Sequence, residues 1–173
     1  MISLLKENIE SALNKQINWE LYSAYMYLSM SAYFNSIGMA GFASWMRVQA
    51  QEEQLHAMKL FDHIVARGGR VHLMEIAQPP LEWSSPTNVF EETYKHEQKV
   101  TALINDLVSL AKSEEDYATK NMLQWFVDEQ VEEEESASEV FEKIKLVGTD
   151  GSGIYILDKE MGLRSFTPPK KAE

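Results

Sequence analysis

The chain contains no cysteine, which excludes a disulfide framework and any zinc site built on thiolates. It has no apolar run of about 18 residues, the length that spans a membrane, and its start, MISLLKENIESALNKQ, has no apolar segment of signal-peptide type. Cationic side chains are also few, with 16 Lys and Arg against 27 Asp and Glu and a formal net charge of −11. Binding to nucleic acid is disfavoured, because it requires phosphates to be neutralised by Lys and Arg. We expect a cytoplasmic protein with no membrane partner and with cations among its ligands.

The chain is rich in long helical patterns. Of its 173 residues, 45% are hydrophobic and 25% are charged, as in an ordinary globular domain. Four segments repeat apolar residues at the helical period; they cover about residues 3–36, 40–67, 85–112 and 114–147. Gly68-Gly69 provides a stop signal for the second segment, while Ser85 followed by Pro86 is typical of a helix start.

The connections between these segments predict the topology. Only a few residues join the first segment to the second and the third to the fourth, so each pair should form an antiparallel hairpin. About seventeen residues, with Pro79-Pro80 in their middle, separate the two hairpins. A helix of about 28 residues is about 42 Å long, and an extended connection of this length can just span it. The predicted fold is all-α, a four-helix bundle with one long crossover connection.

A short amphipathic segment follows the bundle. We assign residues 1–147 to the bundle and residues 148–173 to a linker, a short fifth helix and a tail of the same domain. In IYILDKEMGLRSF, Ile154, Leu157 and Met161 share one side. A helix of about ten residues is not stable alone in water, so it should dock on its own bundle or on a neighbouring subunit. The terminal TPPKKAE is expected to fray.

Polar residues interrupt the apolar stripe of every long segment near its midpoint. Antiparallel helices bring their midpoints to one level, so these side chains should converge inside the bundle. They are Glu20, Glu53, His56, Glu97, Gln130 and Glu133. A single inward Glu or Gln is usually a hydrogen-bonded structural group, but four interruptions at one level indicate a common site.

The charge of this layer indicates metal. A buried, unpaired carboxylate costs several kcal/mol, and no stripe contains a Lys or Arg, so the carboxylates must either be protonated or be neutralised by cations. Two divalent ions would balance four carboxylates. Carboxylates with one imidazole suit iron or manganese better than zinc. The pairs Glu53/His56 and Gln130/Glu133 have the i, i+3 spacing of neighbours on one helix face.

Other polar residues allow two interpretations. Glu52 and Glu129 lie beside the inward residues and either extend the site toward one edge or face solvent. Tyr27, two turns beyond Glu20, is either a core aromatic or a hydrogen-bond donor to the site. The remaining histidines have no partner at ligand spacing and are expected at the surface: His63, His72 and His96.

The sequence resembles the bacterial and archaeal non-haem ferritins across about residues 4–166. The segments that carry the resemblance are QINWELYSAYMYLSM, FASWMRVQAQEEQLHAMKLFDHIVARGG, YKHEQ and WFVDEQVEEE. It implies a ferritin-like four-helix bundle that oxidises Fe(II) with O2 or peroxide and stores Fe(III) as mineral. It also implies a hollow homo-oligomeric cage of twenty-four subunits, with the fifth helix near the four-fold axes.

The same resemblance assigns roles to residues. It implies paired iron sites, with Glu53 bridging two ions, formed by Glu20, Glu53, His56, Glu97 and Glu133. Gln130 would lie beside them, and Tyr27 matches the tyrosine near the ferroxidase centre. Glu52 and Glu129 match the extra carboxylates of a third iron site that shares Glu133.

Departures from related families narrow the interpretation. Bacterioferritins carry a haem-binding Met directly after the Glu of ExxH, where this chain has Gln54, so no haem is expected and a haem-bearing electron-transfer bundle is disfavoured. A rubrerythrin would need cysteines. Lys120 and Leu123 stand where animal ferritins have the acidic pair of their three-fold channels, so that iron entry route is not expected. The remaining alternative is a structural bundle with a protonated polar layer.

Overall fold

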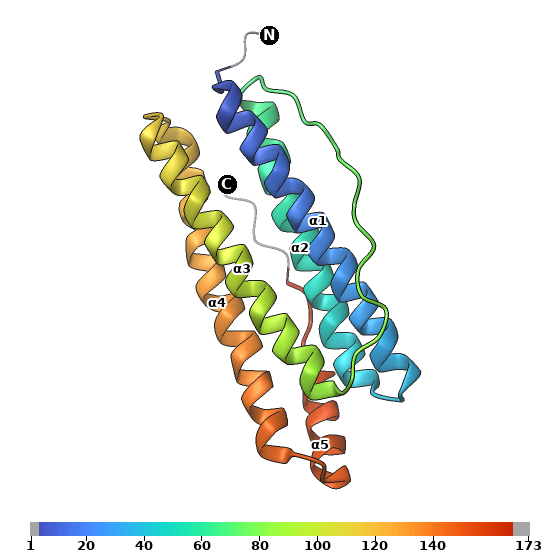
Figure 1. The fold of residues 1–173 in the computed structure, drawn as a ribbon. Helices are drawn as coiled ribbons and strands as arrows, with labels where there is room; N and C mark the ends of the chain where they lie inside the picture. Colours follow the sequence, from blue (N-terminus) through green and yellow to red (C-terminus); the bar gives the residue numbers. More distant parts are fainter. Residues whose placement is uncertain (1–3, 168–173) are drawn as a thin grey trace.

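The computed structural model describes residues 4–167 and has an all-α fold. Within that range there are five helices and no strand: α1 (Glu7–Ser36), α2 (Ala40–Ala66), α3 (Pro86–Ser113), α4 (Tyr117–Val147) and α5 (Gly151–Met161). Figure 1 shows α1 and α2 as one antiparallel hairpin, α3 and α4 as a second, and α5 at one end of the bundle. The predicted four-helix bundle with a short fifth helix is confirmed. No helix in the described range is long and apolar enough to cross a membrane.

The predicted crossover runs along α1 from the end of α2 to the start of α3 (Figure 1). Polar side chains of α1 hold its backbone. The Asn14 side chain donates to the carbonyl oxygen of Arg70 (3.1 Å) and accepts from the backbone N–H of His72 (2.6 Å). Near the other end of α1, the Ser29 hydroxyl donates to the carbonyl oxygen of Pro80 (2.7 Å). These bonds fix an extended segment that has no helical bonds of its own.

Side-chain caps set the starts of α3 and α4. Ser85 accepts from the backbone N–H of Asn88 (3.1 Å), with Pro86 as the first helical residue, as the sequence predicts. The start of α4 lies later than predicted, because Asp116 accepts from the backbone N–H of Thr119 (3.0 Å) and fixes the boundary there. The helix α1 likewise begins at residue 7 and not near residue 3.

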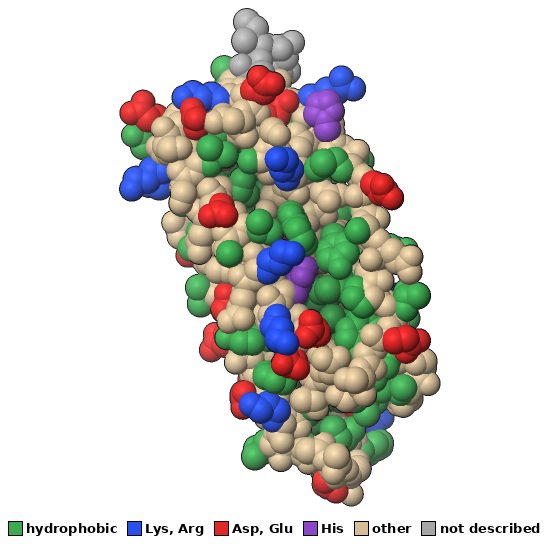
Figure 2. All heavy atoms as spheres, in the orientation of Figure 1, with side chains coloured by type: hydrophobic (Ala, Val, Ile, Leu, Met, Phe, Trp, Pro, Cys, Tyr) green, Lys and Arg blue, Asp and Glu red, His purple; other side chains and the backbone are tan. Residues whose placement is uncertain are grey.

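Two apolar cores fill the bundle, one toward each end. One joins the carboxyl-terminal part of α1 with the start of α2 and includes α5; the other joins the start of α1 with the end of α2. Every stripe position predicted to point inward along α1–α4 is buried. Some apolar side chains remain outside: Figure 2 shows them over α1, between α3 and the crossover.

The fifth helix docks on its own bundle, which decides between the two alternatives left by the sequence. It begins earlier than predicted, at Gly151, because Asp150 accepts from the backbone N–H of Gly153 (2.9 Å). Leu157 and Met161 are buried in the first core. The expectation that TPPKKAE is frayed falls, beyond Thr167, outside the described residues.

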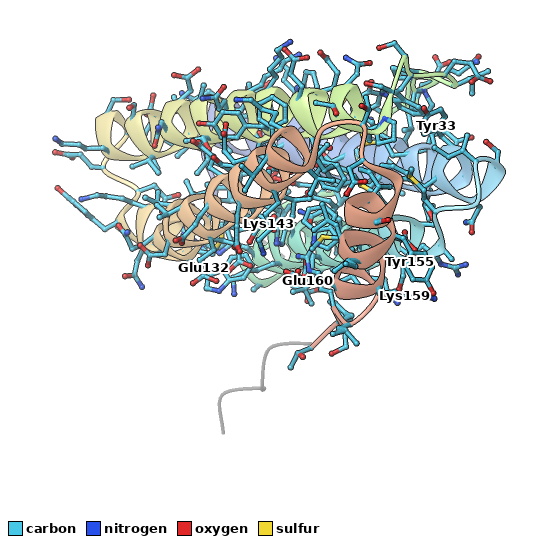
Figure 3. The ribbon with its side chains drawn as sticks, turned by 90° about the horizontal axis from the view of Figure 1, so that it is seen from below. Tyr33, Glu132, Lys143, Tyr155, Lys159 and Glu160 are labelled. Atoms are coloured by element: carbon cyan, nitrogen blue, oxygen red, sulfur yellow. The ribbon has the colours of Figure 1, made fainter. Side chains whose placement is uncertain are left out.

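Close backbone contact fixes α5 against the first turn of α2. An Asp158 carboxylate oxygen accepts from the backbone N–H of Phe42 (3.0 Å). A Cβ on Gly41 would lie 1.6 Å from the carbonyl oxygen of Asp158, so only glycine permits this approach. On the other flank, Lys143 of α4 pairs with Glu160 of α5 at 2.7 Å, and Figure 3 shows these two side chains on facing sides of their helices.

Gly41→Ala should therefore release α5. Elsewhere in a helix this change is favourable by up to about 1 kcal/mol, but here the added methyl group overlaps the backbone of Asp158. We expect amide hydrogen exchange within α5 to become much faster while α1–α4 stay protected. Gly151→Ala is the matched control, because a Cβ there meets nothing within 4 Å. Equal protection of α5 in both variants would contradict this account of the contact.

Candidate metal centre

The six polar residues predicted to converge are all buried, and they lie between the two apolar cores. Their exposed fractions are at most 5%: Glu20 0%, Glu53 1%, His56 1%, Glu97 1%, Gln130 3% and Glu133 5%. All four long helices contribute at least one of them. Glu97 and the i, i+3 pairs in α2 and α4 therefore point inward, as the helical period predicts.

Carboxylates and the imidazole form three groups in which one ligand atom per residue lies within 4.8 Å of the others. The groups are Glu20/Glu53/His56, Glu53/Glu97/Glu133 and His56/Glu129/Glu133. Glu53 belongs to the first two, as a carboxylate that bridges two ions would. Four buried atoms have no hydrogen-bond partner within the described chain: Glu20 Oε2, Glu53 Oε1 and both ring nitrogens of His56. Such orphaned donors and acceptors fit a cation that binds between them.

Neutral amides orient two of the carboxylates. Gln16 donates to Glu20 Oε1 at 2.8 Å, so the other oxygen of Glu20 is left for a ligand. Gln49 donates to Glu133 Oε2. Neither glutamine is among the six residues that the sequence predicts to converge at the site. Their spacing, four residues before Glu20 and Glu53, is the signal that could have found them.

The carboxylate of Glu97 is held by two more neutral donors. The Tyr27 hydroxyl donates to Glu97 Oε1, which supports the donor interpretation of this tyrosine over a purely apolar role. Gln130 donates to Glu97 Oε2 at 3.3 Å and is also close to the Thr101 hydroxyl. Gln130 thus faces the site as a hydrogen-bond donor. An amide donor orients a carboxylate without cancelling its charge.

Burial changes the titration of the layer. Loss of hydration, with the nearby charge of Glu133, raises the pKa of Glu97 to about 8. Loss of hydration also raises the pKa of Glu133 to about 7, with a further contribution from Glu52 and against the opposing effect of His56. Desolvation also raises the pKa of Glu53 well above its ordinary value, against the opposing effect of His56. For His56, burial lowers the pKa, but the carboxylates of Glu53, Glu129 and Glu20 more than reverse this and raise it. Without a cation, the centre therefore retains protons near neutral pH.

The two flanking carboxylates behave differently from each other. Glu129 Oε1 lies 3.8 Å from His56 Nε2, so Glu129 extends the centre toward one edge as one of the two interpretations allows. Glu52 is instead paired with the Arg164 guanidinium at 2.5 Å. The stripes do lack a Lys or Arg, but this cation arrives from the segment after α5. Sequence reasoning missed Arg164, because no local pattern relates it to α2.

Two histidine predictions are wrong. His96 is half-buried, its Nε2 lies 2.7 Å from the Ser23 hydroxyl oxygen, and desolvation lowers its pKa to about 4. His63 is half-buried and its Nε2 lies 3.0 Å from the Thr119 hydroxyl oxygen. Only His72 is exposed as expected. Hydroxyl partners on neighbouring helices account for both exceptions, and sequence spacing does not reveal them.

The fold and the centre together define a class: four-helix bundles with one crossover and, at mid-height, buried carboxylates and an imidazole that could hold metal. Comparison with known proteins agrees. The family model described as Ferritin-like domain matches residues 10–147, and by this match the chain belongs to the ferritin family.

Its relatives cover nearly the whole chain. A bacterial non-heme ferritin of Bacteroides fragilis (strain 638R) is 42% identical over 161 residues, 93% of this chain and 100% of that protein. One from Escherichia coli O6:H1 is 41% identical over 158 residues, 91% and 96% of the two chains. The solved open-pore ferritin of Archaeoglobus fulgidus is 55% identical with a TM-score of 0.92, covering 93% of this chain and 98% of that one.

The buried carboxyls predict an unusual pH dependence of stability. An acid whose pKa is higher in the folded than in the unfolded protein stabilises the fold when it is protonated. This contribution to the free energy of unfolding is complete below the unfolded pKa, near 4.5, and is lost as the pH rises through the folded pKa values of about 7 to 8. Glu97→Gln removes one such group. We expect the metal-free variant to melt above the parent at pH 8 and close to it at pH 5.

Bound metal should reverse the order of the two melting temperatures at pH 8, so that the parent melts above Glu97→Gln. An ion that binds only the folded state stabilises it, and protons compete with it for the same carboxylates. Added Zn(II), a redox-silent probe, should raise the melting temperature of the parent more at pH 8 than at pH 5, and should raise that of Glu97→Gln less. Strong destabilisation of metal-free Glu97→Gln, with an unchanged Zn(II) response, would make Glu97 a structural partner only.

Proposed function

We propose that the protein is an iron-storage ferritin that oxidises Fe(II) at the paired centre and stores Fe(III) as mineral inside a homo-oligomeric cage. The sharing of Glu53 between two adjacent ligand groups is the observation that carries the proposal. Orphaned atoms on Glu20, Glu53 and His56 support it, because they are oxygen and imidazole ligands that iron accepts. The ferritins named above support the cargo and the assembly.

Two Fe(II) ions held side by side supply two electrons. In the proposed reaction each ion loses one electron, and O2 takes up two electrons and two protons to give hydrogen peroxide; a peroxide would instead give two waters. Glu20 and His56 hold one ion, Glu97 and Glu133 hold the other, and Glu53 bridges them. Hard anionic carboxylates favour the Fe(III) product.

The neighbouring residues prepare the ligands. Tyr27 and Gln130 keep the Glu97 carboxylate in one orientation, and Gln16 does the same for Glu20. Because the carboxyls retain protons without metal, binding of Fe(II) must release protons before oxidation begins. Fe(II) binding should therefore weaken as the pH falls below neutral.

Removal of the shared carboxylate tests the site. Glu53→Ala deprives both ions of a ligand, so we expect the initial rate of aerobic Fe(II) oxidation to fall on the order of tenfold to a hundredfold. The ultraviolet absorbance of Fe(III) measures this rate. Glu132→Ala is the control, because Glu132 lies on the same acidic stretch of α4 but is exposed. An unchanged rate in Glu53→Ala would refute the proposed centre.

Exposed apolar side chains support assembly with further copies of the chain. Tyr25 and Leu28 of α1 line a groove together with Ile76 and Leu81 of the crossover, and Leu81 is 61% exposed. Exposed apolar side chains gathered on a surface and bordered by polar residues are typical of protein–protein contacts. We propose that this groove is one of the contacts between subunits of a twenty-four-chain cage.

Charges placed in the groove should disrupt the particle. We expect the intact protein to sediment as a single large particle and the double variant Leu28→Glu/Leu81→Glu to sediment as much smaller species with unchanged helicity, since two carboxylates cannot be buried there without partners. Glu82→Gln, at the exposed neighbouring position, should assemble normally. Sedimentation velocity distinguishes these outcomes. A monomeric intact protein would contradict the storage proposal, because one bundle encloses no mineral cavity.

A further inference from the structure

Arg164 forms a specific set of contacts beside the metal centre that the iron chemistry above does not use. Its Nη1 donates to Gln49 Oε1 at 2.7 Å and its Nη2 contacts Glu52 Oε2 at 2.5 Å. Its guanidinium carbon lies 4.3 Å from the centre of the Trp45 ring. Trp45, Gln49 and Glu52 follow one another at helical spacing along one face of α2, so the whole guanidinium lies on that face.

The docking of α5 determines where Arg164 lies. The bond between Asp158 and the Phe42 backbone, and the close approach of Gly41 to Gly162, hold the end of α5 on the first turn of α2. The chain then leaves α5 in a non-helical conformation (Figure 1), and Arg164 reaches α2 from it. Residues 162–167 are called the C-terminal strap below.

The contacts of Arg164 separate Glu52 from the other carboxylates. The sequence places Glu52 next to Glu53, and the resemblance assigns it to a third iron site with Glu129 and Glu133. In the described structure, the third ligand group instead consists of His56, Glu129 and Glu133, and Glu52 belongs to none of the three groups. The carboxylate oxygen nearest Arg164 is occupied by a charge-assisted hydrogen bond.

Arg164 is also linked, through Gln49, to the ligand group of His56, Glu129 and Glu133. Gln49 accepts from Arg164 with its amide oxygen and donates to Glu133 with its amide nitrogen. Arg164 therefore fixes the orientation of the amide that holds Glu133, a member of two ligand groups. Loss of the guanidinium would free one carboxylate and loosen the donor on another.

We propose that Arg164 is a positioning residue that keeps Glu52 out of the third metal position, so that an ion beside His56, Glu129 and Glu133 gains Glu52 only by displacing the guanidinium. The inference rests on the proposed function, because it presumes that ions bind at the adjacent pair. A guanidinium stays charged at every pH at which the protein folds. Loss of a proton from Arg164 therefore cannot free Glu52, and a competing cation must displace the guanidinium.

Titration calorimetry with Zn(II) tests the proposal on the assembled protein. Relative to the parent, Arg164→Gln should still bind the two ions of the pair and should bind a third ion on the order of tenfold more tightly, a difference of about 1.4 kcal/mol. Arg164→Lys, which keeps a cation at this position, should restore much of the competition. Adding Glu129→Ala to Arg164→Gln should remove the gain, which assigns the third ion to this position.

Two controls separate the contact from general effects. Lys159→Gln removes a cation from α5 whose ammonium contacts the Tyr155 ring and not Glu52, so it should leave the third ion as in the parent. Amide hydrogen exchange of α5 in Arg164→Gln should match the parent, because Gly41 and Asp158 still hold the helix. If α5 is released in Arg164→Gln, Glu52→Gln is used instead, because it removes the same ion pair from the α2 side. The double variant Glu52→Gln/Arg164→Gln should then bind the third ion with the same affinity as Glu52→Gln alone.

The outcomes separate this inference from the proposed function. If the first two ions bind normally and the third ion binds with the same weak affinity in the parent and in Arg164→Gln, the proposed role of Arg164 is overturned but the proposed function is not. The role of Arg164 is also overturned if Arg164→Gln binds the third ion more weakly than the parent, or if Lys159→Gln binds it as tightly as Arg164→Gln does. Absence of the first two ions in the parent instead overturns the proposed function.

Discussion

Ionisable side chains at the middle of an apolar bundle are the constraint on which the rest of this structure depends. Burial and repulsion by neighbouring carboxylates raise the pKa values of Glu53, Glu97 and Glu133, so the centre keeps protons near neutral pH when no cation is bound. An isolated charge at such depth would cost several kcal/mol, a large part of the stability of an ordinary domain. The two apolar cores on either side supply the burial that offsets this cost.

Neutral hydrogen-bond donors orient the carboxylates of the layer without neutralising their charge. Tyr27, Gln16, Gln49 and Gln130 each donate to a carboxylate oxygen, so the ligands are oriented while their charge remains. A Lys or Arg in the same places would neutralise the carboxylates and remove the reason for a cation to bind. The choice of amides and a phenol thus favours a centre that binds cations and can release them.

At the edge of the layer, in contrast, a carboxylate is paired with a cationic side chain. Arg164 neutralises Glu52, which is only partly buried, and leaves Glu129 near His56. Desolvation raises the pKa of Glu52 even so, because the opposing effect of Arg164 is smaller. The strap therefore connects the C-terminal end of the fold to a carboxylate at the edge of the centre. The close contact of α5 with Gly41 is what holds this coupling in place.

The sequence by itself determined the helices, the crossover and the convergence of residues such as Glu20, Glu53 and Glu97, because helical periodicity and antiparallel packing place helix midpoints at one level. It did not identify Gln49, which donates to Glu133, as part of the centre. Only the tertiary structure decided that α5 docks on its own bundle and that Arg164 pairs with Glu52, across 112 residues of chain. Such contacts depend on where separate elements meet, and periodicity within one element contains no information about that.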